Sequence, residues 1–261
     1  LRHDGSGKNA FKNPLSFRYL DDNFIESDAV KIGKTFMDYL KKTKDPRIHV
    51  YCSLKDGNTE FDKQFGLPNG YDSHTIADAP SGSFVGLENT SNFNINTILR
   101  LDAPTIFLMP SETKLLLAEA VLRNWTNGNA EVLYKEAITS SMKEQEIAYG
   151  TQGKITDEEI ETYLAQNLLS TANNTEKLQI IGEQYWVATF INGYESYANW
   201  RRTGYPKLIP TNYSGSMSPG VIPTRLPYPT DEYSINRANV DTANQQQGAD
   251  KVTTHIWWDI D

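Results

Sequence analysis

A Gly-Lys-Thr triplet is the first feature of this 261-residue chain whose residue types could do chemistry, because such a triplet ends a phosphate-binding P-loop. A P-loop also requires a strand upstream and a further glycine five residues before Gly33. Asp28 occupies that position, and Gly33-Lys34-Thr35 falls inside a helical pattern. The sequence therefore predicts no nucleotide site at this triplet.

Histidines and carboxylates offer the other routes to catalysis or metal binding. None of the four histidines lies four residues from another, as a helical zinc site requires: His3, His49, His74 and His255. Carboxylate pairs are plentiful, but acid–base catalysis depends on separations of about 5–10 Å in space, which the sequence does not supply. A single cysteine, Cys52, excludes a disulfide framework and Cys-rich zinc sites. We therefore predict no catalytic residue, no metal ligand and no cofactor.

Composition narrows the classes of partner. The chain carries 25 Lys and Arg against 33 Asp and Glu, a net charge of −8, which argues against a broad basic surface for nucleic acid or anionic lipid. No apolar run approaches the roughly 20 residues that span a bilayer. Aromatic residues make up 11% of the chain, more than its core needs. This surplus of aromatic residues leaves rings available for surface contacts outside the core.

The elements that would position such residues begin with a loop-rich region over 1–108, expected to carry a ligand-binding face. Turn-forming Gly, Asn, Asp, Ser and Pro recur every few positions, and only 29–42 shows a helical spacing of apolar residues. Asp45-Pro46 should end that helix, because the residue before proline is disfavoured in helical conformation. The aromatic residues of the region indicate an ordered, functional surface.

Residues 109–150 show the periodicity of two helices. An apolar stripe at spacings of three and four runs over 115–122 and again over 130–141, with Gly128 in the turn between them. Small residues where the two helices must approach make the pair similar to one tetratricopeptide repeat. One repeat cannot bury its own apolar face, so neighbouring helices must cover it.

The third part, 151–261, is predicted to hold C-terminal helices followed by a docked, proline-rich tail. Thr156 and Glu159 form a capping-box pattern that should begin a helix. A second helix is predicted over 175–191, and a short one should run over 193–202.

The tail after Pro206 is expected to have little regular structure, because prolines recur along it. Polar residues over 239–248 favour a mobile loop. The aromatic end, 255–258, should dock on the body of the protein.

Several blocks of sequence in the helical part look like the last tetratricopeptide unit of a known family and the segments after it. They are Leu115-Leu116-Leu117-Ala118-Glu119-Ala120, Asn129-Ala130-Glu131, Ala137-Ile138-Thr139-Ser140-Ser141-Met142, Glu183-Gln184-Tyr185-Trp186-Val187-Ala188, Trp200-Arg201-Arg202-Thr203-Gly204-Tyr205-Pro206, Arg225-Leu226-Pro227-Tyr228-Pro229 and Trp257-Trp258-Asp259, with Asp45-Pro46-Arg47 upstream. In this order and spacing the chain resembles the SusD/RagB family, the nutrient-binding outer-membrane lipoproteins of Bacteroidetes. Tyr185 stands where the family pattern has a basic residue, a mild departure.

The resemblance implies a mainly α fold, in which tetratricopeptide-like helical hairpins carry long, irregular, loop-rich excursions. Family members are much longer than this chain and begin with a lipoprotein signal, an acylated cysteine and further repeats. The chain therefore looks like the C-terminal half of one SusD-like domain. Attachment to the membrane is expected only through a lipid anchor on the missing N-terminal part.

The function implied by the resemblance is non-catalytic capture of a nutrient glycan at the extracellular face of the outer membrane. The glycan would then pass to a TonB-dependent, SusC-like transporter. Three alternatives remain open: a peptide-binding member of the same family, a tetratricopeptide-type scaffold for protein interactions, and an all-helical glycoside hydrolase. The last would need two carboxylates facing each other across a cleft.

Candidate ligand-binding residues lie in loops over 48–100, because binding aromatics in this family come from loops outside the repeats. The candidates are Tyr51, Phe65, Tyr71 and Phe84 as platforms for sugar rings, and Asn69 and Asp72 as partners for hydroxyl groups. Trp125, in the turn between two helices, is a further exposed candidate. Aromatic residues in loops can alternatively pin the loop to the core.

The signature blocks themselves have a structural interpretation. Arg201 and Arg202 should fix a helix end and pair with a semi-buried acid such as Glu119. Tyr228 should pack the tail on the helices, and the tryptophans at 257–258 should dock the C-terminus.

Overall fold

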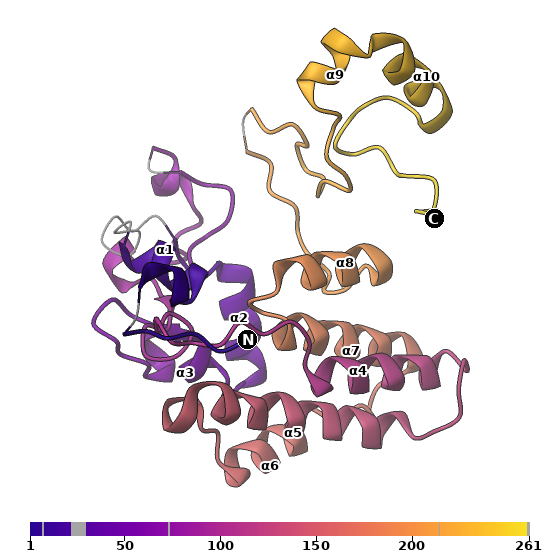
Figure 1. The fold of residues 1–261 in the computed structure, drawn as a ribbon. Helices are drawn as coiled ribbons and strands as arrows, with labels where there is room; N and C mark the ends of the chain where they lie inside the picture. Colours follow the sequence, from indigo (N-terminus) through magenta and orange to yellow (C-terminus); the bar gives the residue numbers. More distant parts are fainter. Residues whose placement is uncertain (7, 22–29, 73, 214, 260–261) are drawn as a thin grey trace.

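Helices dominate the computed structural model, which describes residues 1–6, 8–21, 30–72, 74–213 and 215–259 (Figure 1). The helices are α1 (Pro14–Asp21), α2 (Lys34–Thr43), α3 (Ile48–Tyr51), α4 (Pro110–Leu122), α5 (Ala130–Tyr149), α6 (Asp157–Gln166), α7 (Asn174–Ala188), α8 (Gly193–Thr203), α9 (Thr230–Ile235) and α10 (Arg237–Gln247). The strands β1 (Cys52–Ser53) and β2 (Asn92–Phe93) pair in antiparallel register. The predicted mainly α fold is confirmed.

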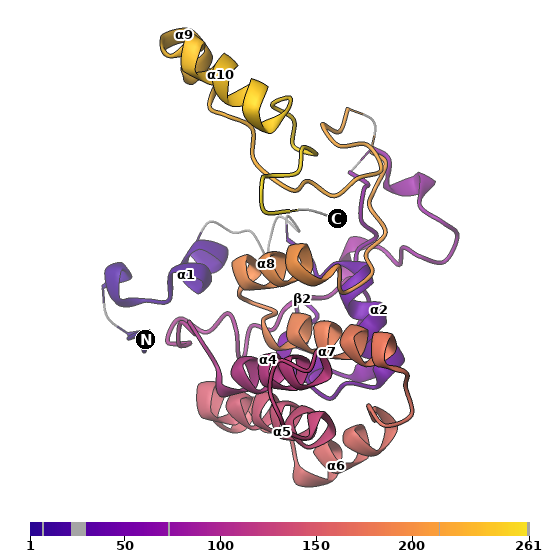
Figure 2. The same ribbon diagram turned by 90° about the vertical axis from the view of Figure 1, so that its right-hand side faces the viewer.

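The helical body is built on the antiparallel hairpin of α4 and α5, which confirms the predicted helix pair. Ala118 and Ala137 are fully buried, and these small side chains let the two helices approach closely. α7 packs on α4, and α6 lies against α5, as both views show (Figures 1 and 2). Within the described ranges, no helix is both long and apolar enough to span a bilayer.

The predicted capping box begins α6. Glu159 N–H donates to Thr156 Oγ1 at 3.2 Å, and Thr156 N–H donates to Glu159 Oε2 at 2.8 Å. The two flanking isoleucines, Ile155 and Ile160, are buried and fix the entry of the chain into the helix. The two helices predicted next are also present, as α7 and α8.

The helix predicted over 29–42 begins later than expected, at Lys34. Residues 30–33 are irregular or extended, because Leu67 N–H donates to Ile32 O and Lys34 N–H donates to Leu67 O, each at 2.7 Å. Gly33 forms a parallel bridge with Leu67. This long-range pairing overrides the local periodicity. Ala29, at the expected start, lies outside the described residues together with Asp28.

The tail after Pro206, expected to have little regular structure, contains the two helices α9 and α10. Residues 239–248, predicted as a mobile loop, fall mostly in α10. Val240 is buried, and Arg237 pairs with Asp241 one turn later, which together stabilise an otherwise polar helix. Figure 2 shows α9 and α10 standing away from the helical body.

A single carboxylate, that of Asp250, organises residues 225–250, which include α9 and α10 and are called the C-terminal unit below. Asp250 accepts hydrogen bonds from Arg225 Nη2 at 2.7 Å, from the Tyr233 hydroxyl at 2.6 Å and from the Tyr228 backbone N–H at 3.1 Å. Tyr228, expected to pack the tail on the helices, instead hydrogen-bonds within the C-terminal unit, and the guanidinium of Arg225 lies over its ring.

The C-terminal end contacts α8 through Arg201. Its guanidinium lies 4.5 Å from the ring centroid of Trp258 and 3.4 Å from Asp259 Oδ2. The neighbouring Trp257 is 83% exposed. One of the two tryptophans is therefore docked, as predicted, and the other projects into solvent.

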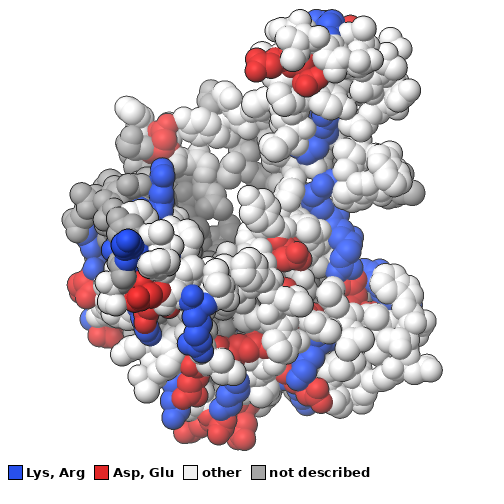
Figure 3. Space-filling view, viewed as in Figure 1, with Lys and Arg blue, Asp and Glu red and all other residues white. Residues whose placement is uncertain are grey.

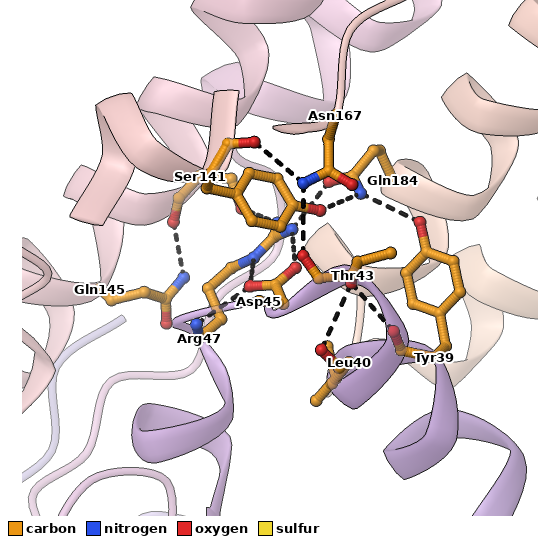
Figure 4. A network of polar contacts seen from close by, with 10 residues as sticks. Tyr39, Leu40, Thr43, Asp45, Arg47, Ser141, Gln145, Asn167 and Gln184 are labelled. Carbon is orange, nitrogen blue, oxygen red and sulfur yellow. Dashed lines mark hydrogen bonds and ion pairs between the residues drawn. The ribbon is translucent and has the colours of Figure 1, made fainter. Parts of the chain in front are cut away.

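A buried ion pair joins the loop-rich region to the helical body (Figure 4). Arg47 Nε donates to Asp45 Oδ1 at 2.9 Å, and both side chains are inaccessible to solvent. Arg47 also donates to Ser141 Oγ of α5 at 3.0 Å and to Gln184 Oε1 of α7 at 2.7 Å. Gln184 in turn donates to the Tyr163 hydroxyl of α6 at 2.7 Å. This network fixes the loop after α2 on three helices at once.

Glu119 of α4 forms the predicted pair with Arg202 at the end of α8, whereas Arg201 pairs with Asp259. The carboxylate of Glu119 accepts two hydrogen bonds from Arg202, both at 2.7 Å, and one from Arg123 at 2.7 Å. Burial alone raises the pKa of Glu119, but the hydrogen bonds from Arg202 and Arg123 outweigh that effect and hold the pKa below its usual value.

Replacing Glu119 with Gln is expected to lower the free energy of unfolding by about 1–2 kcal/mol at pH 7, because charge-assisted hydrogen bonds are lost. A carboxyl whose pKa is depressed in the folded state stabilises it above the unfolded pKa of about 4.3, and this contribution disappears as the pH falls through the folded pKa. The difference between Glu119→Gln and the parent should therefore shrink below about pH 4. Urea unfolding at pH 7, 5 and 3 tests this, and a difference that is constant with pH contradicts it.

Candidate functional site

The candidate Tyr51 is part of the core. Its ring is 3% exposed and stacks on Phe190, with the centroids 4.8 Å apart, and Phe36 also stacks on Phe190. A ring enclosed in this way cannot offer a face to a ligand. The expectation that Tyr51 is a sugar platform is therefore corrected: here the aromatic side chain pins its segment to the core.

Phe65 and Phe84 are more accessible than Tyr51, but neither lines a groove together with another candidate. Phe65 is 40% exposed, and the ammonium of Lys41 lies 4.2 Å from its ring centroid. Phe84 is half-buried in the loop after Pro80. Trp125 is exposed, as expected, and Arg123 lies over its ring.

Asn69 and Tyr71 lie together in a groove of about 530 Å³. One wall is the loop that contains them, and the other is the irregular segment after α8. The first turns of α2 form the rest of the lining. The groove is lined by Lys34, Thr35, Asp38, Pro68, Asn69, Gly70, Tyr71, Pro80, Ser83, Ile209, Pro210, Thr211 and Asn212.

Two glycines allow the groove walls to approach their neighbours. Gly66 crosses the start of α2 so closely that a Cβ on it would lie 2.7 Å from Lys34 N. Gly70 has a φ of +85°, and a Cβ on it would lie 2.8 Å from Thr211 Cβ on the opposite wall. Glycine is therefore required at both positions, at Gly66 by the close approach and at Gly70 also by its backbone conformation.

Asp72 connects the two walls of the groove. Its Oδ2 accepts a hydrogen bond from the hydroxyl of Tyr213 at 2.5 Å, and its Oδ1 accepts from the N–H groups of His74 and Thr75. These hydrogen bonds, that of Tyr213 first, hold the pKa of Asp72 far below its usual value. The structure therefore places Asp72 as a brace of the groove, with its oxygens already engaged.

Neutral polar groups and apolar rings line the groove, and both are available to a ligand. Lys34 Nζ and Asp38 Oδ2 are 2.6 Å apart, so their charges largely compensate each other. The remaining polar lining is amide and hydroxyl, which can both donate and accept hydrogen bonds. Tyr71 and the prolines supply apolar surface. Among the described residues, no group of three or more His, Cys, Asp or Glu is placed to hold a metal ion.

A second hollow, of about 330 Å³, lies beside this groove. It is lined by Gly33, Thr35, Phe36, Asn69, Trp186, Leu208, Ile209, Pro210, Thr211 and Ile222. Sequence reasoning did not nominate Trp186, because it lies in a predicted helix and the candidates were sought in loops. No sequence pattern identified Lys34 and Asp38 as groove residues either, since only the fold brings α2 to the loop that contains Asn69 and Tyr71.

A further hollow of about 510 Å³ lies between α3 and α6, and none of the predicted site residues lines it. Positive and negative side chains alternate over the lower helices on the face drawn in Figure 3. Over those helices that face carries no extended basic patch.

A family model described as "Starch-binding associating with outer membrane", of SusD-like type, matches residues 4–229. No curated protein matches the chain.

Solved structures agree with the family match. A chitin-binding protein is 29% identical, with a TM-score of 0.77 over 97% of this chain and 54% of that protein. A SusD homologue from Bacteroides fragilis is 26% identical, with a TM-score of 0.70 over 87% of this chain and 51% of that one. A SusD-like protein from Bacteroidetes shares the fold, with a TM-score of 0.78 at 23% identity over 100% of this chain and 60% of that one. The chain thus spans between half and two thirds of the length of these proteins.

Proposed function

Because this chain belongs to the SusD-like family of starch-binding proteins that associate with the outer membrane, we propose that it binds a nutrient glycan in the groove between Tyr71 and Pro210. The observation that carries this proposal is the lining of the groove. A half-buried tyrosine ring and proline rings can stack on the apolar faces of sugars, while amides and hydroxyls bond to their hydroxyl groups. We propose further that binding is non-catalytic.

We propose the setting of this activity on the basis of the same family membership. The whole protein would be lipid-anchored at the extracellular face of the outer membrane and would deliver its ligand to a TonB-dependent, SusC-like transporter. The 29% identical chitin-binding protein makes a polymer of N-acetylglucosamine the first ligand to test, and the family description makes starch the second.

Affinity electrophoresis in native gels that contain glycol chitin or starch tests the proposal. We expect one of the two polysaccharides to retard the chain. Replacing Tyr71 with Ala should weaken binding about tenfold, equivalent to about 1.4 kcal/mol, because an aromatic face is removed from the groove. Tyr194→Ala is the matched control, since Tyr194 is exposed on α8 and does not line the groove.

Three outcomes would count against the proposal. Absence of retardation by either polysaccharide would contradict binding of these glycans, and equal retardation of Tyr71→Ala and the parent would contradict the groove as the site. Cleavage of the polysaccharide during the run would contradict non-catalytic binding.

A further inference from the structure

The groove and the second hollow share part of their lining, which we call the ridge. Five residues line both of them: Thr35, Asn69, Ile209, Pro210 and Thr211. The amide Nδ2 of Asn69 lies 3.4 Å from Thr35 Oγ1, so the ridge carries an amide and hydroxyl groups. A ligand that crosses the ridge would find hydrogen-bonding partners at the crossing.

Trp186 supplies an aromatic ring on the far side of the ridge. It is half-buried and packs edge-on against Phe36, with ring centroids 4.9 Å apart and planes at 83°. Tyr39 contacts it in a similar way at 5.9 Å. These contacts hold the indole in place, and Leu208 and Ile222 complete an apolar surround. The second hollow is thus a preformed aromatic site.

Aromatic rings and polar groups therefore alternate across the two hollows: the Tyr71 ring, the amide and hydroxyl groups of the ridge beside its apolar Ile209 and Pro210, and the Trp186 ring. A chain of linked sugars presents the same alternation, because the apolar face of each ring is bordered by hydroxyl groups. Among the described residues that line the two hollows, the charged ones are Lys34 and Asp38, and these two pair with each other. This lining suits an uncharged chain.

Resting on the proposed function, we propose that Trp186 forms a second subsite and that the ligand is a neutral glycan chain of several sugar units. The chain crosses the ridge at Asn69, with one unit on Tyr71 and another on Trp186. Short oligomers fill one hollow, and longer ones fill both.

Calorimetric titration with N-acetylchitooligosaccharides and malto-oligosaccharides of one to six units tests this subsite. We expect the affinity for the bound series to rise at least tenfold once the oligomer is long enough to reach the second hollow, and then to level off. Trp186→Phe keeps a ring against Phe36 but reduces the platform, so it should remove most of this gain while leaving the shortest binding oligomer unchanged. Ile222→Asn should act in the same direction, and Ile235→Asn, on exposed α9, is its matched control.

The length dependence separates a subsite from a structural role. A damaged fold weakens binding of all oligomers equally, and that result for both Trp186→Phe and Ile222→Asn would overturn the subsite. Equal affinity of the parent for short and long oligomers would overturn it as well, while leaving the proposed function intact. Failure of both series to bind at any length would contradict the proposed function and this inference together.

Discussion

Replacing Asp45 with Asn is expected to lower the free energy of unfolding by about 3–5 kcal/mol, because it leaves the buried guanidinium of Arg47 without a counter-charge. Asp45 accepts hydrogen bonds from the backbone N–H, Nε and Nη2 of Arg47. Burial alone would lower the pKa of Arg47, yet the charge and hydrogen bonds of Asp45 outweigh it and raise the pKa. The arginine therefore stays charged and must be accommodated in the variant. Urea unfolding followed by circular dichroism measures the loss.

Asp102→Asn is the matched control for this prediction. Asp102 pairs with Arg100 at the same two-residue spacing, but their side chains are 46% and 37% exposed. An exposed pair is worth about 0–1 kcal/mol, so this variant should remain close to the parent. Equal losses in Asp45→Asn and Asp102→Asn would show that burial of the network contributes nothing to stability.

Replacing Gly66 with Ala is expected to lower the free energy of unfolding by about 3 kcal/mol, the upper end for overpacking. The added Cβ would meet backbone atoms of Lys34 and Gly33, which cannot turn away as the end of a flexible side chain can. Either the first turn of α2 or the loop from 65 to 71 must move. Both line the groove, so glycan binding should fall by at least tenfold as well. Thermal unfolding and affinity electrophoresis report the two effects separately.

Gly193→Ala provides the comparison for Gly66→Ala. Gly193 is the first residue of α8, and a Cβ on it would meet nothing within 4 Å. Alanine also favours the helix by up to about 1 kcal/mol, so this variant should be as stable as the parent or slightly more stable. Suppose that Gly66→Ala had the same glycan affinity and the same free energy of unfolding as Gly193→Ala. The close approach of the backbone at Gly66 to that at Lys34 would then have no consequence.

Features encoded within a few residues of sequence were predictable. The capping box at Thr156, the turn at Gly128 and the apolar stripes of α4 and α5 each act over one or two helical turns, and all three are present. The pairing of Glu119 with Arg202, 83 residues apart in the chain, is an exception, because the semi-buried position of the acid on its helix predicts a basic partner.

Features decided by distant contacts were not predictable in the same way. Residues 30–33 share the apolar spacing of a helix, but hydrogen bonds with Leu67 and Ser91 hold them outside α2. α10 is too polar for periodicity to reveal it. The ring of Tyr51 belongs to the core because Phe190, far along the chain, packs on it. Periodicity and turn signals carry no information about such partners.

The candidate site shows the same division. Loop position and side-chain chemistry predict Asn69 and Tyr71 as ligand-binding residues, and both line the groove. The opposite wall, from Ile209 to Asn212, had no motif, and its position depends on Gly70 and on the bond between Asp72 and Tyr213. Whether the predicted residues bind a ligand stays a prediction.

The long sequence separation between Asp72 and Tyr213, which hydrogen-bond across the groove, also affects the order in which the molecule folds. Asp72 and Tyr213 are 141 residues apart, whereas the hairpin of α4 and α5 is closed by a short turn. Closing a longer loop costs more chain entropy, so short-range helical contacts form first and the groove closes late. During refolding, helical circular dichroism should recover before glycan binding does.

A glycan that contacts both walls of the groove would also slow the separation of those walls. Amide hydrogens along 66–72 would then exchange more slowly when the glycan is bound.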